Sequence, residues 1–365
     1  MNSINLQNVS KSYGGIAAVK DLNLDIEERQ FLTLLGPSGC GKTTTLRIIA
    51  GLEEPDDGEV IIRDEMVFSM AKGIFVPPEK RKLGLIFQSY ALWPHMTVRK
   101  NVSLALEEMK LPRQQIESRV REALEKVQLT EYVERFPSEL SGGQQQRVAV
   151  ARMIAAGPGI FLMDEPLSNL DAMLRIDMRA ELKHLHHELE ATTVYVTHDQ
   201  VEALTLSDKI AVMHQGVLRQ LGTPEEIYKT PADLFVAKFV GSPRINVISG
   251  TLVTEGTSQY FVSGKLKHKV DRHLSFQGKE VLGTIRPEDL EISTVEREGW
   301  LKTRTYSVLP AGSETIVTVE NETTSLAVKV NGFTDIKIDD ELWLSFNPLS
   351  MNYYDPHTEQ LIVAR

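Results

Sequence analysis

The sequence has little cysteine, no long hydrophobic run and no strongly basic stripe. Its 365 residues include one cysteine, Cys40, so no intrachain disulfide can form, which suits a reducing compartment. No uninterrupted apolar stretch approaches the roughly 20 residues that a membrane helix needs, and the N-terminal segment lacks the apolar core of a signal peptide. The net charge of −10 argues against general nucleic-acid affinity. We therefore expect a soluble chain that reaches a membrane only through a partner.

Short apolar runs alternate with helical patterns over the first two-thirds of the chain. This alternation predicts an α/β domain with a mainly parallel sheet and helices on both faces. Three successive helical patterns interrupt it, which predicts a helical subdomain at about 89–155. The runs expected to form buried strands are 31–35, 83–88, 159–164, 192–198 and 209–213, and the helical patterns between them include 43–52 and 176–189.

The composition changes after about residue 235. Helical patterns disappear, and short segments rich in β-branched residues are separated by Gly, Asn and Asp, which is typical of a small all-β domain. We predict an α/β domain over 1–235 and a small, OB-like β-barrel domain over 236–365, with a linker at 241–243. The expected strands of the second domain are 247–253, 279–285, 313–320, 325–330 and 341–346.

GPSGCGKT at 36–43 fits the P-loop pattern of a nucleotide-binding protein. Its glycines let backbone N–H groups turn toward phosphates, and the helix that follows adds its positive end. Lys42 is expected to reach the β/γ oxygens and Thr43 to reach Mg²⁺. We interpret Cys40 as a structural residue and not as a redox switch, because this loop binds through its backbone. Tyr13 is expected in the loop after a first strand at 4–10, where its ring would stack on adenine. The other residues predicted to bind ATP are Gly36, Pro37, Ser38, Gly39, Cys40, Gly41, Lys42, Thr43 and Thr44.

Polar residues end three of the expected strands. Asp164 is placed to hold Mg²⁺ through water, and Glu165 follows it as a candidate base for the attacking water. His198 is expected to contact the γ-phosphate, and Gln88 to sense Mg²⁺ or the attacking water. We therefore predict Glu165, His198 and Gln88 as catalytic residues, and Thr43, Gln88 and Asp164 as metal-site residues. The alternative for each is a strand-end polar side chain with no role beyond solvation.

LSGGQ at 140–144 is a second glycine-rich cluster. Two adjacent glycines cost about 1 kcal/mol each relative to Ala within a helix. At a helix N-terminus, however, they would let bare N–H groups approach an anion. The sequence therefore predicts a second phosphate site and leaves open whose phosphate it binds.

Taken together, the P-loop, LSGGQ, FLMDE (161–165), SNLD (168–171) and His198 resemble the ATP-binding subunits of ABC transporters, over residues 1–235. In that family LSGGQ faces the nucleotide of a second copy, so the resemblance implies a homodimer or paired ATPase subunits. It also implies that Gln88 and residues 89–98 meet two membrane-spanning permease subunits at the cytoplasmic face of the membrane, and that a solute-binding protein acts indirectly. The residues implied to contact the partner's ATP are Ser141, Gly142, Gly143, Gln144 and Asp171.

The C-terminal third resembles the β-barrel regulatory domain of importer ATPases. GSPRIN (241–246) and GTIRPEDL (283–290) carry this resemblance and are most similar to the carbohydrate branch. Import of polyamine, iron(III) or phosphonate is the alternative within the family. Outside it, the alternatives are an ABC-type ATPase without a transporter and a regulatory binding protein. Intact Glu165 and His198 argue against the last, and a single P-loop without long heptads argues against the ribosomal and DNA-repair types.

Overall fold

The structure is a computed structural model that describes residues 2–270, 274, 276, 278–321 and 324–363. The chain divides into two compact units, Met1–Pro224 and Glu225–Arg365. This division comes earlier than the predicted boundary at residue 235, because two short helices belong to the second unit. The predicted outer limits, residues 1 and 365, lie outside the described residues.

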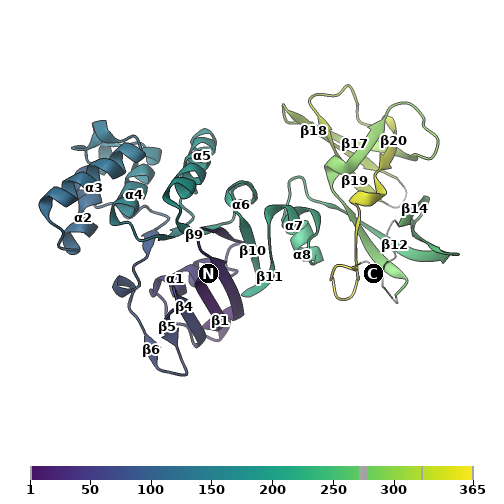
Figure 1. The fold of residues 1–365 in the computed structure, drawn as a ribbon. Coiled ribbons are helices and arrows are strands. Elements are labelled where there is room, and N and C mark those ends of the chain that lie inside the picture. The colour runs from purple at the N-terminus through teal and green to yellow at the C-terminus, as the bar shows by residue number, and fades with distance from the viewer. Residues whose placement is uncertain (1, 271–273, 275, 277, 322–323, 364–365) are drawn as a thin grey trace. The chain divides into compact units, whose positions relative to one another are not determined.

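A mainly parallel sheet forms the centre of the first unit (Figure 1). In the described part of the chain its order is β11-β10-β3-β9-β8-β7, and β11 runs antiparallel to β10 while the other neighbours are parallel. The five expected strands are present close to their predicted ends. The strands are β3 (Phe31–Leu35), β7 (Gly84–Ile86), β8 (Ile160–Asp164), β9 (Thr192–Thr197), β10 (Lys209–His214) and β11 (Val217–Gly222).

Alternate residues of the central strands enter two different cores, as the pleat of a strand requires. In β8, Phe161 and Met163 join the core beneath the helices, whereas Ile160 and Leu162 join the core on the other face. A strand covered on both faces needs apolar residues at every position. This explains why continuous apolar runs were sufficient to predict the sheet.

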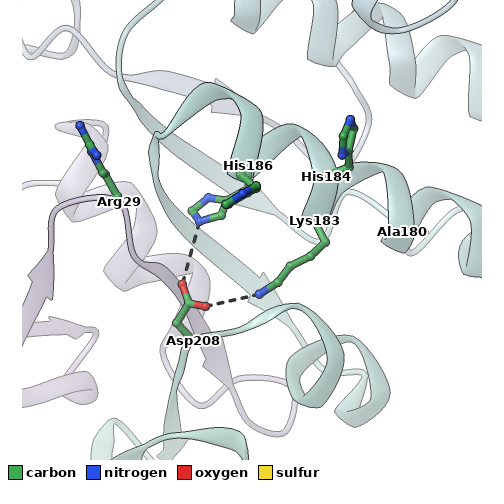
Figure 2. A pocket seen from close by; sticks show the side chains of 7 residues that line it. Arg29, Ala180, Lys183, His184, His186 and Asp208 are labelled. Carbon is green, nitrogen blue, oxygen red and sulfur yellow. Dashed lines mark hydrogen bonds and ion pairs between the residues drawn. The ribbon is translucent and has the colours of Figure 1, made fainter.

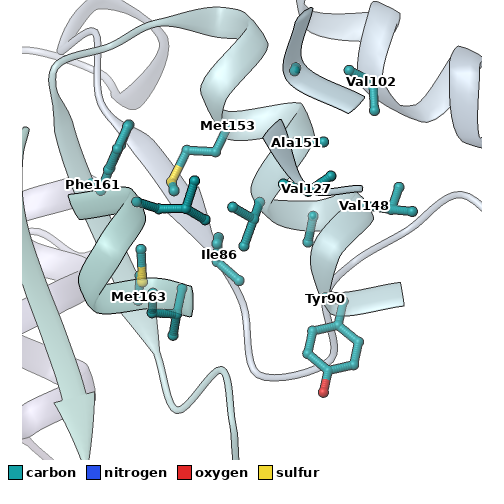
Figure 3. Close-up of a cluster of buried hydrophobic side chains, with 14 of the residues drawn as sticks. Ile86, Tyr90, Val102, Val127, Val148, Ala151, Met153, Phe161 and Met163 are labelled. Atoms are coloured by element: carbon teal, nitrogen blue, oxygen red, sulfur yellow. The ribbon is translucent and has the colours of Figure 1, made fainter. Parts of the chain in front are cut away.

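The predicted helical insert is present between β7 and β8. It contains α2 (Val98–Glu108), α3 (Arg113–Lys126) and α4 (Gly142–Ala156), with the 3₁₀ turns η2 (Thr130–Tyr132) and η3 (Pro137–Glu139). Figure 3 shows how Val148 and Met153 of α4 lie in one apolar cluster with Ile86 and Phe161 of the sheet. Residues of α5 (Ala172–Leu189) and α6 (Gln200–Leu206) complete this core.

The other face of the central sheet shares a core with α1 (Lys42–Ala50) and with an antiparallel sheet. The sequence predicted a first strand near the N-terminus but not this sheet. Its order in the described residues is β2-β1-β4-β5-β6, followed by the 3₁₀ turn η1 (Pro78–Lys80). The strands are β1 (Asn2–Tyr13), β2 (Ile16–Glu27), β4 (Asp57–Ile62), β5 (Glu65–Ser69) and β6 (Ile74–Phe75).

The second unit begins within α7 (Pro224–Lys229), includes α8 (Leu234–Phe239) and continues as two antiparallel sheets, so the expected all-β domain is present. In the described residues the first sheet has the order β14-β13-β12-β15-β21 and the second β16-β20-β17-β18-β19, whose end strands β16 and β19 lie close together in a nearly closed barrel. The strands and 3₁₀ turns are β12 (Asn246–Glu255), β13 (Ser258–Ser263), β14 (Leu266–Val270), β15 (Glu280–Ile285), η4 (Pro287–Asp289), β16 (Leu290–Ser293), β17 (Leu301–Pro310), β18 (Glu314–Glu320), β19 (Ser325–Asn331), β20 (Glu341–Phe346), η5 (Pro348–Ser350) and β21 (Asn352–Tyr354).

The two short motifs that carried the C-terminal resemblance meet in this unit. The buried Arg286 guanidinium lies 4.1 Å above the Tyr228 ring and donates to the carbonyls of Tyr228 and Val240. Gly241 has a φ of 112°, and a Cβ there would lie 2.6 Å from Arg286 Nη1. The segments at 241–246 and 283–290 therefore hold the helices against the sheets.

Candidate active site

The P-loop joins the central strand β3 to helix α1, as its sequence predicts. Gly36 and Gly41 are required by the fold itself, because a Cβ would lie 2.3 Å from the Met213 carbonyl oxygen at the first and 2.2 Å from the Ala18 carbonyl oxygen at the second. Gly41 also has a φ of 105°, which disfavours other residues. The backbone of this loop can therefore adopt its conformation only with glycine at these two positions.

Lys42 is buried at the start of α1. Its ammonium donates to the carbonyl oxygens of Gly36, at 2.7 Å, and Pro37, at 3.0 Å. Nearby, burial raises the pKa of the Cys40 thiol, which keeps the thiol protonated and unreactive at neutral pH. Lys42 thus places its positive charge inside the loop, whereas Cys40 contributes packing.

Thr43 and Asp164 bring two oxygen groups together at the end of the sheet. The Thr43 hydroxyl donates to Asp164 Oδ1 at 2.9 Å. Burial raises the pKa of the Asp164 carboxyl, and the hydrogen bond from Thr43 opposes that shift. A buried carboxylate beside a hydroxyl is a donor set of the kind that Mg²⁺ binds through a few protein oxygens.

Gln88 and His198 converge on one oxygen of Glu165. His198 Nδ1 lies 3.2 Å from Glu165 Oε2, and Gln88 Nε2 donates to the same oxygen at 3.4 Å. Glu165 follows β8 with a φ of 46°, a left-handed conformation that is unusual for a residue with a side chain. The structure thus brings the three predicted catalytic residues together.

Ser168 and Asn169 are site residues to which the sequence analysis gave no role. Ser168 Oγ donates to the Glu165 carbonyl oxygen at 2.9 Å and accepts from Gln88 Nε2 at 3.3 Å. Asn169 Nδ2 donates to the Gln88 carbonyl oxygen at 3.0 Å. Their positions in SNLD, which is separated from FLMDE by two residues, were the available signal. The first half of that motif therefore positions the loop that carries Gln88.

The LSGGQ turn forms the N-terminus of α4, as its glycines predicted. Ser141 caps the helix by accepting from Gln144 N at 3.3 Å, and Gln144 Oε1 accepts from Ser141 N at 2.9 Å. Gly142 is exposed, whereas Gly143 is buried against Leu174. In Figure 1, α4 lies among the helices and apart from α1, so this turn is not placed beside its own P-loop.

Asp171 and Tyr13 lie at the surface of the first unit. Asp171 caps α5 by accepting from Leu174 N at 3.0 Å, so it has a structural role within its own chain. Tyr13 was expected in a loop but is the last residue of β1. The residue is 47% exposed, and Lys11 Nζ lies 5.5 Å from its ring centroid. An exposed aromatic ring is available for stacking.

A cavity of about 580 Å³ lies away from these residues, against the C-terminal half of α5 (Figure 2). Among its charged groups, Asp208 lies 3.4 Å from Lys183 Nζ and 3.9 Å from His186 Nε2. Burial lowers the pKa of His186, so this imidazole is mainly neutral at pH 7. Within the described residues, no group of three or more His, Cys, Asp or Glu side chains is arranged to hold a metal ion. This cavity contains none of the predicted site residues.

The family comparisons agree with the two units. The ABC transporter family model matches residues 19–168, and the TOBE domain model matches 283–351. The chain is 53% identical to the trehalose/maltose import ATP-binding protein MalK of Thermococcus litoralis, over 80% of this chain and 79% of the relative. It is 42% identical to the oligosaccharides import ATP-binding protein MsmX of Bacillus subtilis, over 94% of each chain.

Among solved structures, the chain is similar to a dimeric ATP-binding cassette in a post-hydrolysis state, bound to ADP and Pi. The two share 33% identity with a TM-score of 0.53, over 60% of this chain and 98% of the cassette. Within the described residues, every helix of the present chain is too short or too polar to cross a membrane. On the strength of these matches, the chain belongs to the ABC transporter ATPases with a C-terminal TOBE domain.

Proposed function

We propose that the chain hydrolyses ATP to drive the import of a carbohydrate through separate membrane subunits. The observation that carries the catalytic part is the convergence of Gln88 and His198 on Glu165 Oε2, next to the Thr43–Asp164 pair. The proposal that the solute is a carbohydrate rests on the two relatives, whose names describe import of trehalose/maltose and of oligosaccharides. Polyamine, iron(III) and phosphonate are the solutes that a test must exclude.

In this proposal Glu165 accepts a proton from the attacking water. A carboxylate that accepts from Gln88 Nε2 and lies 3.2 Å from His198 Nδ1 is held in one orientation, and a water between it and the γ-phosphate would be oriented by it. His198 would also donate to the γ-phosphate. Tyr13 would stack on adenine, and Lys42 would exchange its carbonyl partners for phosphate oxygens.

Mg²⁺ fits the oxygen groups at the end of the sheet. Thr43, Asp164 and Gln88 would hold it, directly or through water, together with the phosphates of ATP. Such a site needs one or two protein carboxylates, as found here, and not a cluster of them. When bound, the ion would neutralise the charge that develops on the phosphates.

The exposed LSGGQ turn favours a dimer in which Ser141, Gly142, Gly143 and Gln144 contact the partner's ATP. A two-fold interface makes two equivalent sites. Asp171, at the surface beside this turn, would link them. Trp93, in the loop after Gln88, is 48% exposed and would contact a permease subunit. In this proposed arrangement the chain would lie at the cytoplasmic face of the membrane.

The test is a pull-down from membranes of the source organism with the Glu165→Gln variant and ATP. This variant should bind ATP without hydrolysing it and so remain as an ATP-bound dimer. We expect it to retain two multi-span permease subunits. The matched control carries Glu165→Gln together with Lys42→Ala and should retain less of them, because it binds ATP weakly.

The solute is identified from the binding protein associated with those permeases. Binding of a malto-oligosaccharide or a related sugar, measured by calorimetry, supports the carbohydrate proposal. Binding of a polyamine, iron(III) or a phosphonate contradicts it and leaves import standing. Recovery of ribosomes, nucleic acid or soluble proteins without permeases contradicts the transport function and leaves ATP hydrolysis standing.

A further inference from the structure

We propose that Arg175 is a positioning residue for ATP hydrolysis that fixes the segment after Glu165 and the turn carrying His198 relative to each other. The inference rests on the proposed role of Glu165 and His198. Arg175 lies in the first turn of α5 and contacts neither side chain within hydrogen-bond distance in the described residues. Its guanidinium instead joins the two backbone segments that carry them.

On one side, Arg175 holds the segment between Glu165 and Asp171. Arg175 Nη2 donates to the carbonyl oxygens of Leu170, at 3.2 Å, and Ser168, at 3.4 Å. Ser168 in turn donates to the Glu165 carbonyl oxygen and accepts from Gln88. Through this segment, Arg175 restrains the backbone that carries the proposed base.

On the other side, Arg175 holds the turn that contains His198. Arg175 Nη1 lies 3.4 Å from Asp199 Oδ2. The second oxygen, Asp199 Oδ1, accepts from Val201 N at 2.8 Å and from Glu202 N at 3.1 Å and so caps α6. Asp199 is therefore fixed by both its oxygens, and His198 precedes it directly.

A small cavity shows that these groups surround one space. It has a volume of about 10 Å³, room for about one water molecule. Arg175 Nε is buried and has no hydrogen-bond partner within the described residues. Arg175 thus borders the same space as the proposed catalytic pair. The lining residues are Glu165, Ser168, Arg175, Thr197, His198, Asp199 and Glu202.

Such a restraint matters for this pair because packing alone does not fix the His198 side chain or the Glu165 backbone. The His198 side chain is 55% exposed, and Glu165 has a left-handed backbone conformation that the surrounding structure must maintain. A displacement of about 1 Å at a reacting group can reduce a rate about 100-fold. Loss of Arg175 should therefore lower turnover more than it lowers nucleotide binding.

The experiment measures kcat, KM for ATP and melting temperature in the full-length protein with ATP and Mg²⁺. Arg175→Gln should lower kcat about tenfold or more, with KM changed less than about twofold. Arg175→Lys keeps the charge but not the planar guanidinium fork, so its kcat should lie between those of the parent and of Arg175→Gln. Arg113→Gln is the control for loss of a positive charge, because that side chain is 93% exposed.

Asp199→Asn separates positioning from folding. Asparagine caps a helix about as well as aspartate, so α6 should keep its N-cap while the ion pair with Arg175 is lost. We expect kcat to fall with little change in melting temperature. Because both variants break the same link, combining Arg175→Gln with Asp199→Asn should reduce kcat no further than the worse single change does.

Three results would overturn the inference: kcat of Arg175→Gln within about twofold of the parent, additive losses in the double variant, or a loss that disappears at a lower temperature where the variant is fully folded. If Arg175→Gln does not fold, Asp199→Asn decides the question alone. Absence of ATP hydrolysis in the unmodified protein would instead refute the proposed function.

Discussion

The two glycine-rich turns of the first unit differ in what their glycines are needed for. In the P-loop, a Cβ at Gly36 or Gly41 would meet a backbone carbonyl oxygen of the same chain at 2.3 or 2.2 Å. In the LSGGQ turn, a Cβ at Gly142 would meet the Leu170 side chain at an ordinary 3.5 Å. The P-loop glycines are therefore required by the fold of this chain, whereas Gly142 is not.

Gly142 lies at the exposed start of a helix, and the fold of this chain does not require a glycine there. This favours a role for Gly142 in contact with another molecule. Gly142 is the first residue of α4, where backbone N–H groups have no partner within the helix. The difference between the P-loop glycines and Gly142 therefore favours a binding partner for the LSGGQ turn on physical grounds, in agreement with the dimer implied by the family resemblance. Gly143 is intermediate, because it packs against the flexible end of Leu174.

The largest effect is expected for Gly41→Ala. The added Cβ would collide with the Ala18 carbonyl oxygen and would also require a φ of 105°, so we expect a loss of at least about 3 kcal/mol in the free energy of unfolding. The matched control is Gly39→Ala in the same loop, which has a φ of 79° and open space. It should cost about 1–2 kcal/mol. Urea denaturation of both variants measures the difference, and equal losses would refute the steric argument.

Lys42→Ala should weaken nucleotide binding while leaving the fold intact. Lys42 is the buried charge in the P-loop, and a charge-assisted hydrogen bond contributes about 1.5–3 kcal/mol, so we expect ATP affinity to fall roughly 10- to 100-fold. Lys20→Ala, at an exposed position, is the control. Calorimetric titration with ATP and Mg²⁺ tests this, and an unchanged affinity would contradict the P-loop assignment.

The sequence predicted the central sheet but not the antiparallel one, for a physical reason. Strands buried on both faces, such as β8, appear as continuous apolar runs. Strand β1 instead mixes exposed and buried residues, and its pairing with β2 shifts register several times, so neither a continuous run nor a strict alternation marks it. β4 begins with Asp57, in an acidic segment typical of a turn.

The site divides in the same way. Asp164 and Glu165 could be predicted because both stand at the end of an apolar run beside a P-loop in the same chain. The contacts of Asn169 and Arg175 could not be predicted, because these side chains reach residues that are distant in sequence, Gln88 and Asp199. A local motif shows that a residue is present, whereas only the fold shows which distant group its side chain contacts.

Ser141→Arg should abolish ATP-dependent dimerisation without lowering ATP affinity of the monomer. The long, charged side chain would occupy the exposed start of α4, where we place the partner's phosphate. Ser141→Ala loses the same helix cap, at a cost of about 1 kcal/mol, without adding bulk. Light scattering in the Glu165→Gln background with ATP compares them. A dimer of normal stability in the arginine variant would remove the LSGGQ turn from the interface.

Gly142→Ala is expected to have the smallest effect on stability and to test the comparison most directly. At an exposed helical position with room for a Cβ, alanine should stabilise the fold by up to about 1 kcal/mol. If the glycine instead serves a close approach of the partner's phosphate, the same change should weaken ATP-dependent dimerisation. A rise in melting temperature together with a weaker dimer would show that the chain gives up stability at this position for binding. A rise in melting temperature with an unchanged dimer would mean that the partner does not require this glycine, and the distinction between the two turns would then rest on Ser141.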